Sequence, residues 1–211
     1  MRFTNRKSAG KLLAEKLEKY SKDDVVVYAL PRGGVILGAE IARHIKAPLD
    51  LVITRKIGHP MQPEYAIAAV TEEGEMVANH QEISQVDKNW LKQETEAQKN
   101  EAKRRRVLYL KGKKHLKAGS KTAIVVDDGI ATGFTMKAAI LQLKKEKPLK
   151  LVVAIPVTPR STAEALKNEA DEVISLDIPS DYNYLGAVGA YYDEFYQIND
   201  EQVIQVLDKF K

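Results

Sequence analysis

The fold is decided by the stretch Val125-Val126-Asp127-Asp128-Gly129-Ile130-Ala131-Thr132-Gly133-Phe134-Thr135. Its apolar start is typical of a strand buried on both faces of a parallel sheet. Two adjacent carboxylates follow, and such a pair is costly unless it shares cations or hydroxyl donors. The turn at 131–135 then opens a helix, whose N–H groups and threonine hydroxyls can surround a phosphate. The stretch therefore predicts a sugar phosphate site, with the phosphate on one side and hydroxyls or a metal ion on the other.

Strand-like apolar runs alternate with helical patterns on both sides of this stretch. Strands are expected at 25–30, 49–55, 123–126, 151–155 and 173–176, and helices at 6–20, 35–45, 134–146, 161–170 and 200–210. Ser161 and Asp200 are the expected N-caps of the last two helices. The alternation predicts an α/β fold with a mostly parallel sheet flanked by helices. Ligands in such folds bind outside the carboxyl ends of the strands, where the acidic pair is expected to lie.

The region between the second and third predicted strands departs from this alternation. A hairpin is expected at 64–77 and a long polar helix at 84–110. Between residues 92 and 106 two alanines are the sole apolar residues, so the middle of this helix is expected to project into solvent. With 211 residues, the chain is expected to be one domain, 1–211, in which 56–118 forms an inserted hairpin plus long basic helix.

Composition excludes several kinds of site. The chain has no cysteine, which rules out disulfides, thiolate nucleophiles and cysteine-ligated zinc. Its four histidines show no i, i+4 pair, which argues against a histidine metal site, and a loop histidine such as His59 is more often incidental than functional. No run approaches the roughly 20 apolar residues that span a membrane, and no apolar segment follows the charged N-terminus. We therefore expect a cytoplasmic protein without a membrane partner.

Charge is distributed unevenly along the chain. Residues 99–121 hold ten Lys and Arg against one acid, whereas residues 161–211 hold three Lys against eleven acids. The run Lys103-Arg104-Arg105-Arg106 is of a kind that binds a polyanion such as RNA or DNA. A hydrated surface is the favoured interpretation, because blocks of like charge are commonly solvated. Nucleic acid is therefore an alternative partner rather than the expected one.

Two further segments carry glycine or positive charge at the ends of predicted strands. Pro31-Arg32-Gly33-Gly34 follows the first strand; its glycines free backbone N–H groups to turn toward an anion, and Arg32 adds a permanent charge. A tight turn that merely needs glycine explains this segment equally well. Thr54-Arg55-Lys56 ends the next strand. The Gly-x-Gly-x-x-Gly and Gly-x-x-x-x-Gly-Lys-[Ser/Thr] fingerprints are absent, which disfavours dinucleotide-binding dehydrogenases and P-loop nucleotidases.

Together these segments resemble the type I phosphoribosyltransferase family. Residues 124–135 resemble its phosphoribosyl pyrophosphate (PRPP) signature, residues 31–34 its pyrophosphate loop, and residues 54–56 the basic residues that end its next strand. The resemblance covers about residues 24–180 and implies a type I phosphoribosyltransferase-like fold. The chain is similar to predicted phosphoribosyltransferases of unassigned acceptor. The long helix at 84–110, in place of a short mobile loop, is a departure from better-known members.

The resemblance implies a role for each matching residue. Asp127 and Asp128 would be the catalytic pair that accepts hydrogen bonds from the ribose hydroxyls. The 5-phosphate would be bound by Ala131, Thr132, Gly133, Phe134 and Thr135, and the pyrophosphate by Arg32, Gly33, Gly34 and Lys56. A Mg²⁺ cofactor would bridge pyrophosphate and ribose oxygens, held mostly by ligand and water, so no side chain is assigned as a metal ligand.

The expected function is transfer of the ribose 5-phosphate group of PRPP to an unidentified small-molecule acceptor, with release of pyrophosphate. A nucleobase is one candidate acceptor, and a homo-oligomer is compatible with the sequence. The alternative is a regulator that senses PRPP and binds nucleic acid through 99–121. A hydrolase is disfavoured because no general base is evident. Six aromatic residues near the C-terminus could stack on a base, although packing onto the sheet is the favoured interpretation: Tyr182, Tyr184, Tyr191, Tyr192, Phe195 and Tyr196.

Overall fold

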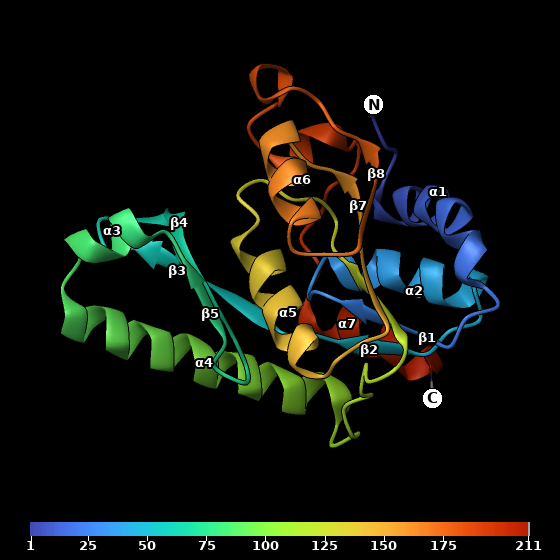
Figure 1. Ribbon diagram of the computed structural model, residues 1–211, viewed down its shortest axis with the longest axis horizontal. Helices are drawn as coiled ribbons and strands as arrows, with labels where there is room; N and C mark the ends of the chain where they lie inside the picture. The colour runs from blue at the N-terminus through green and yellow to red at the C-terminus, as the bar shows by residue number, and fades with distance from the viewer. Residues whose placement is uncertain (211) are drawn as a thin grey trace.

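The centre of the structure is a five-stranded parallel sheet in the order β2-β1-β6-β7-β8 (Figure 1). In the computed structural model, which describes residues 1–210, these strands are β1 Val25–Ala29, β2 Leu49–Leu51, β6 Thr122–Val126, β7 Lys150–Val157 and β8 Glu172–Asp177. All neighbouring pairs in this sheet are parallel. β6 is the middle strand, so the residues that follow it lie at the centre of the sheet's carboxyl edge. The predicted mostly parallel sheet is confirmed.

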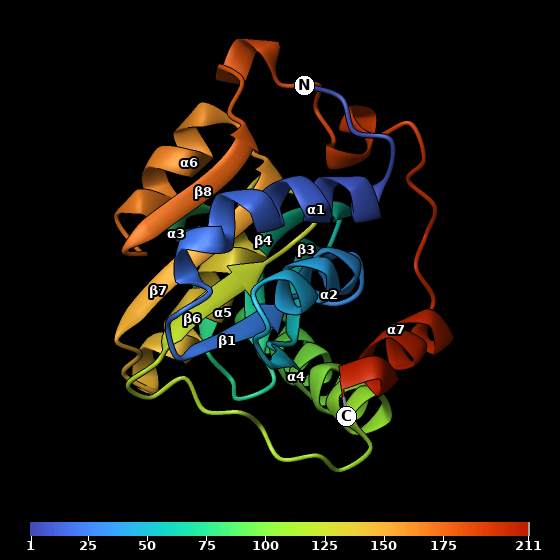
Figure 2. The same cartoon turned by 90° about the vertical axis from the view of Figure 1, so that its right-hand side faces the viewer.

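Helices cover both faces of this sheet, as Figure 2 shows. α1 Arg6–Leu17 and α2 Gly34–His44 lie on one face, and α5 Phe134–Lys145 and α6 Arg160–Lys167 lie on the other. Short 3₁₀ turns occupy four further segments: Glu18–Tyr20, Asp181–Asn183, Val188–Tyr191 and Asp208–Phe210. No helix within residues 1–210 combines the length and the apolar character needed to cross a bilayer.

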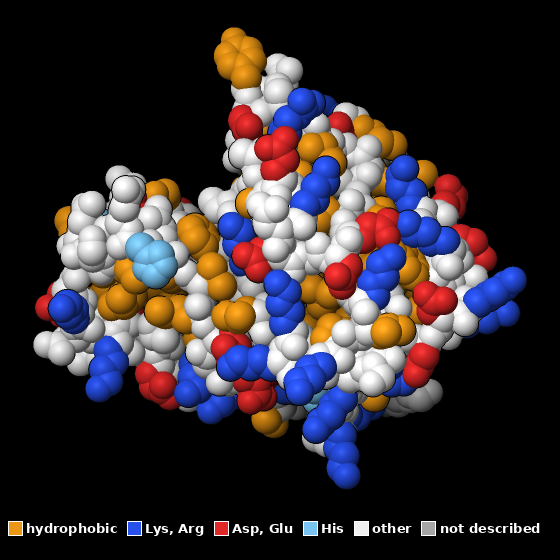
Figure 3. Space-filling model, in the orientation of Figure 1, with side chains coloured by type: hydrophobic (Ala, Val, Ile, Leu, Met, Phe, Trp, Pro, Cys, Tyr) orange, Lys and Arg blue, Asp and Glu red, His pale blue; other side chains and the backbone are white. Residues whose placement is uncertain are grey.

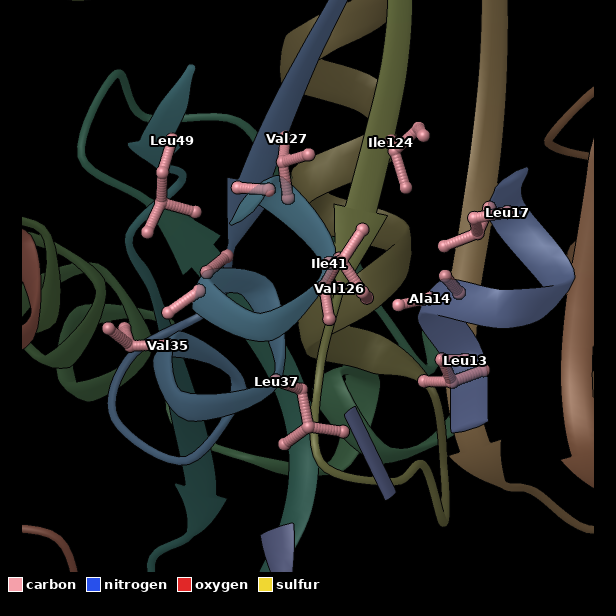
Figure 4. Packing of buried hydrophobic residues seen from close by; sticks show 14 of the residues in the cluster. Leu13, Ala14, Leu17, Val27, Val35, Leu37, Ile41, Leu49, Ile124 and Val126 are labelled. Atoms are coloured by element: carbon pink, nitrogen blue, oxygen red, sulfur yellow. The ribbon is translucent and has the colours of Figure 1, made fainter. Parts of the chain in front are cut away.

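The strands are continuous apolar runs because alternate side chains enter opposite helix layers. Val27 of β1 and Ile124 of β6 face α1 and α2, where Leu13 and Ile41 are fully buried (Figure 4). The other layer packs against α5 and contains Val26, Tyr28, Val125, Val153, Met136 and Ile140. This two-sided burial fixes the ends of β1 and β6, and with them the two loops that follow.

An arm projects from the body between β2 and β6 (Figure 1). It contains an antiparallel sheet of β3 Thr54–His59, β4 Gln62–Thr71 and β5 Met76–Ala78, followed by α3 His80–Gln85 and α4 Lys88–Leu110. The arm has its own apolar cluster, in which Trp90 and Leu91 pack against Ile57 and Ile67. In Figure 3 a notch separates its outer end from the upper part of the body. α4 runs back toward the body, where it contacts α7 Asp200–Leu207.

The arm differs from the predicted hairpin and single helix. The strand expected at 49–55 is divided into β2 and β3, and β3 leaves the main sheet to pair with β4, which makes the hairpin three-stranded. The helix expected at 84–110 is α3 and α4 separated by a break, after which Asp87 caps α4 by accepting a hydrogen bond from Trp90 N at 2.8 Å. Ala102 is fully buried, so the middle of α4 does not project wholly into solvent.

Two predicted N-caps are wrong by one or two positions. Asn199, not Asp200, caps α7, because its side chain accepts a hydrogen bond from Gln202 N at 2.8 Å and Asp200 is already helical. Pro159 occupies the N-cap position of α6. Ser161 lies inside that helix, and its hydroxyl donates a hydrogen bond to Asp181 at 2.6 Å.

Candidate active site

The Arg32–Gly33–Gly34 loop and the acidic pair meet at the carboxyl ends of adjacent strands. Leu30 N donates a hydrogen bond to Val126 O at 2.9 Å, which holds the two strand ends together. A Cβ atom at Gly33 would lie 1.8 Å from Asp128 Oδ2, and one at Gly34 would lie 2.7 Å from Val126 O. Both positions therefore need glycine because the backbone of the loop approaches the residues after β6 closely.

The acidic pair is half-buried and is crowded by its own charge. Asp128 N donates a hydrogen bond to Asp127 Oδ1 at 2.8 Å. Burial and the neighbouring Asp128 carboxylate raise the pKa of Asp127 well above its ordinary value. Burial also raises the pKa of Asp128, against the opposing charge of Arg6. Both carboxyls are therefore groups that hydroxyl donors or a cation would stabilise in the ionised form.

Arg6 is a site residue that the sequence interpretation missed. Its Nε donates to Asp128 Oδ2 at 2.7 Å, and the two side chains are 10% and 15% exposed. A second nitrogen donates to Tyr196 O at 2.7 Å, and the guanidinium lies 3.7 Å from the centroid of the Phe195 ring. No local signal could have found this residue, because 122 positions separate Arg6 from Asp128.

The expected phosphate cradle is the N-terminus of α5. Gly133 occupies the N-cap position with φ +80°, a left-handed conformation that favours glycine. Within residues 1–210 no side chain caps this helix, and the hydroxyls of Thr132 and Thr135 have no hydrogen-bond partner. The backbone of Ala131 is held by α6, because its carbonyl accepts a hydrogen bond from Thr162 at 2.8 Å. Phe134 is half-buried as the first helical residue. Within residues 1–210 the first N–H groups of α5 and these hydroxyls thus lack partners, as an open anion site requires.

The structure separates the two basic residues at the start of β3. Lys56 Nζ bonds Glu64 Oε2 at 3.0 Å on β4, whereas Arg55 Nε donates to Gln98 Oε1 of α4 at 2.9 Å. Successive strand residues point to opposite faces, so these two side chains cannot share one site. Arg32 NH1 lies 3.7 Å from Asp200 Oδ1, and its charge acts on Arg55. Arg55 therefore contacts α4, whereas Lys56 pairs with Glu64 on β4, and the pyrophosphate role of Lys56 stays a prediction.

The aromatic residues near the C-terminus form part of the wall of the site. Tyr192 OH donates to Asp128 O at 2.6 Å, and its ring contacts Phe3 and Phe195. Tyr184 and Tyr191 stack with ring centroids 5.6 Å apart, which leaves Tyr182 and Tyr196 as the exposed members. Packing thus explains most of this cluster. His59 lies at the turn between β3 and β4, where its Nδ1 accepts a hydrogen bond from Met61 N at 3.2 Å.

The basic run 103–106 is not a uniform solvated face. Arg106 is a partly buried anchor whose NH1 contacts Glu72 at 2.7 Å and whose NH2 lies 3.5 Å from Asp50. Arg104 and Arg105 both bond the same acid, Glu101, at 2.7 Å and 2.8 Å. Arg106 therefore anchors the helix, Arg104 is exposed and Arg105 is largely buried. The charge pattern alone does not reveal this difference.

Comparison with known proteins agrees with this geometry. The family model described as the phosphoribosyl transferase domain matches residues 5–194. The chain belongs to the phosphoribosyl transferase family. The match includes all of α1 and the aromatic residues up to Tyr192, whereas Phe195 and Tyr196 lie just beyond it.

Two named relatives and one solved structure are also similar to most or all of the chain. A Mycobacterium tuberculosis protein named "Putative phosphoribosyl transferase" is 36% identical over 98% of this chain, which spans 46% of that relative. The chain therefore covers about half the length of the curated relative. An adenine phosphoribosyltransferase of Mycoplasmopsis synoviae is 28% identical over 80% of this chain and 82% of its own length. A Thermus thermophilus protein of known crystal structure is 38% identical, with a TM-score of 0.81, over 100% of this chain and 99% of its own.

The residues present fit the family's Mg²⁺ only if the substrate and water supply most of the ligand atoms. No group of three or more His, Asp or Glu side chains within residues 1–210 is placed to hold a metal ion. The half-buried carboxylates of Asp127 and Asp128 nevertheless repel each other, and a divalent cation would relieve this repulsion. Mg²⁺ commonly keeps several waters and takes few protein ligands when substrate phosphates are present, which agrees with this sparse donor set.

Proposed function

We propose that this chain transfers the ribose 5-phosphate group of PRPP to a small-molecule acceptor and releases pyrophosphate. The observation that carries the proposal is the close approach of Gly33 to Asp128. This approach supports an order in which the loop after β1, the acidic pair and the N-terminus of α5 follow one another. Pyrophosphate, ribose and 5-phosphate occur in that same order along PRPP.

The chemistry suits a site with positioned charges and no nucleophile of its own. The bond between the anomeric carbon and the pyrophosphate oxygen breaks, and its electron pair leaves with the pyrophosphate. An acceptor atom forms the new bond to the anomeric carbon, which is cation-like in the transition state. The main requirements are alignment of the reactants and stabilisation of the departing anion. Asp127 and Asp128 would hold the ribose hydroxyls, and Arg32 with the Gly33 and Gly34 N–H groups would bind the leaving group.

Mg²⁺ would neutralise part of the pyrophosphate charge when bound. Asp127 is the side chain best placed to interact with that ion, because Asp128 is already paired with Arg6. Arg6 thus has a separate role, which is to favour the ionised form of Asp128 as an acceptor for a ribose hydroxyl.

The acceptor is not assigned, and a nucleobase remains one candidate. The expected cytoplasmic location and a homo-oligomeric state stay predictions. The comparisons give no support to the alternative of a regulator that binds nucleic acid, and the anchoring of Arg106 by Glu72 and Asp50 removes one charge from the proposed nucleic-acid surface.

The test is a turnover assay with PRPP, Mg²⁺ and a panel of purines, pyrimidines and small amines, in which pyrophosphate release is measured. Calorimetry with PRPP and ribose 5-phosphate gives the affinities without an acceptor. We expect Asp127→Asn to abolish pyrophosphate release, whereas Lys103→Gln, on the exposed side of α4, leaves it unchanged. Absence of PRPP binding by the wild-type chain would refute the proposal.

A further inference from the structure

The backbone of the acidic pair is held by a segment that comes more than 60 positions later in the chain. Asp128 O accepts a hydrogen bond from Tyr192 OH at 2.6 Å, and from no other group in the described part of the chain. The |i−j| separation of these two residues is 64. Gly129 follows with φ +151°, and a Cβ atom there would lie 2.5 Å from Val188 Cγ1. Residues 188–192 therefore pack directly against the turn that carries the two carboxylates.

Tyr192 is itself fixed in place. Its side chain is buried, and its ring packs against those of Phe3 and Phe195, with centroids 5.4 Å and 4.9 Å away. Phe3 forms a backbone bridge with Tyr192, in which Phe3 N donates to Tyr191 O at 2.8 Å and Asp193 N donates to Phe3 O at 2.9 Å. Burial raises the pKa of the Tyr192 hydroxyl, so this group stays protonated as a donor. A donor on a ring packed in this way can hold its acceptor in one position.

The position of Asp128 also decides that of its neighbour. Asp128 N donates a hydrogen bond to Asp127 Oδ1 at 2.8 Å, so the backbone of one residue orients the carboxylate of the other. The Asp128 carboxylate is held separately by Arg6 at 2.7 Å. The guanidinium of Arg6 lies over the Phe195 ring, which packs against Tyr192. Both carboxylates are thus linked to the same aromatic segment, one through the backbone and one through Arg6.

We propose that Tyr192 is a positioning residue whose hydroxyl, through the backbone of Asp128, orients both carboxylates of the acidic pair toward the 2- and 3-hydroxyls of the ribose. This assignment rests on the proposed function and adds to it a residue that acts without touching the substrate. Hydrogen bonds weaken steeply when their angle is poor, so a small rotation of the turn reduces recognition of the sugar hydroxyls. The 5-phosphate is bound at the start of α5 in the proposed site, and its contacts do not depend on that rotation.

The competing explanation is that Tyr192 only packs the N-terminal segment against the body. Tyr192→Phe separates the two, because it keeps the ring that contacts Phe3 and Phe195 and removes the hydroxyl alone. Tyr191→Phe is the matched control. Both tyrosines are 4% exposed, and the Tyr191 hydroxyl accepts a hydrogen bond from Leu185 N at 3.0 Å instead of contacting the acidic pair. A role in packing would give the two variants the same behaviour, whereas a positioning role affects Tyr192→Phe alone.

The experiment measures, by calorimetry with Mg²⁺ present, the dissociation constants of ribose 5-phosphate and 2-deoxyribose 5-phosphate. Their ratio isolates the 2-hydroxyl, because the 5-phosphate and the 3-hydroxyl are common to both sugars. We expect the wild-type chain to prefer ribose 5-phosphate by about 10- to 100-fold, the range for one hydrogen bond to a charged group. We expect Tyr192→Phe to reduce this preference by about three- to tenfold, the range for losing one neutral hydrogen bond, and Tyr191→Phe to keep the wild-type preference.

An unchanged preference in Tyr192→Phe would overturn the assignment and leave the proposed function intact. An equal fall in Tyr191→Phe would overturn it too, because packing would then explain both. Partial unfolding of a variant lowers the measured stoichiometry and leaves the ratio of the two constants unchanged, so the ratio still decides. A wild-type chain that binds neither sugar phosphate would refute the proposed function itself. Equal binding of both sugars by the wild type would refute the ribose contact of the acidic pair, and the role of Tyr192 with it.

Discussion

Replacing Arg106 tests whether the arm is held to the body by a buried ion-pair network. Arg106 is 18% exposed, and its acidic partners Glu72 and Asp50 are 2% and 3% exposed. Its NH1 also donates to Leu51 O at 3.1 Å. Asp50 has a second partner, since His115 Nδ1 lies 2.9 Å away. Arg106 therefore joins α4, β2 and the end of β4 in one cluster.

The expected cost of Arg106→Leu follows from what remains buried afterwards. Removing one member of a buried pair typically costs about 3–5 kcal/mol, because the other charge is left without a partner. Glu72 limits this cost, since burial already raises its pKa to about 7 and it can take up a proton. Asp50 keeps His115. We therefore expect a loss near the lower bound, about 3 kcal/mol, which is about 6–12 °C in melting temperature for a domain of this size.

Urea unfolding measures this loss, with Lys103→Gln as the control because that exposed residue lies on the same helix. The double variant Arg106→Leu with Glu72→Gln should be more stable than Arg106→Leu alone, because Glu72, the acid left without a partner, no longer has to be protonated. A loss below about 1 kcal/mol for Arg106→Leu would refute the reasoning. So would a double variant no more stable than the single one.

Three further predictions follow from the site and the buried acids. Gly33→Ala places a Cβ 1.8 Å from Asp128 Oδ2, so we expect at least tenfold weaker PRPP binding in calorimetry. Asp127→Asn removes a like charge beside Asp128, so we expect an unchanged or raised melting temperature. Asp128→Asn leaves Arg6 without its acidic partner, so we expect a lowered melting temperature. Scanning calorimetry of both variants measures the difference. Because the pKa of Glu72 is raised to about 7, this residue binds its proton more tightly in the folded than in the unfolded chain. Its contribution to stability is therefore lost as the pH rises from about 5 through 7. We expect Glu72→Gln to flatten the dependence of the free energy of unfolding on pH in this range.

The parallel sheet was predictable because its strands are buried on both faces. A continuous run such as residues 123–126 has few alternatives to a central strand, and the acidic pair that follows it marks the strand end. The order of apolar strand, acids and threonine loop is local in sequence. The phosphate cradle proposed at residues 131–135 therefore depends on no long-range contact, and neither does the proposed role of the loop at 31–34.

The arm could not be predicted to the same degree because its elements are defined by tertiary pairing. β3 departs from β2 after two residues, and nothing in the run at 49–55 marks the point at which the strand changes sheet. Arg6 reaches Asp128 from the opposite end of the domain, and Arg106 reaches Glu72 across 34 positions. In the sequence such charged residues have no partner nearby, so they are interpreted as solvent-exposed.

Which of Arg55 and Lys56 faces α4 was indicated in the sequence by the position of Ile57, although not by the charges themselves. Ile57 is fully buried, and residues two apart in a strand share a face, so Arg55 follows Ile57 inward while Lys56 points outward to Glu64. A shift of one residue reverses every side chain of a strand. The buried Ile57 therefore identifies Arg55 as the residue that faces α4, which the three-residue motif as a whole does not.

The same reasoning applies to α4, whose weak apolar stripe favoured a solvated helix. An apolar stripe identifies the inward face of a helix only where that face meets other apolar side chains. Where that face meets polar side chains, the inward residues are polar or charged, and their periodicity is hidden among surface charges. Gln98, Arg105 and Tyr109 recur at whole-turn spacings, and each is tied by a hydrogen bond to an element or an acid beside it. The side chain of Arg105 is 17% exposed and that of Arg104 is 57% exposed, so the charge pattern describes the exposed side of this helix correctly and conceals the inward side.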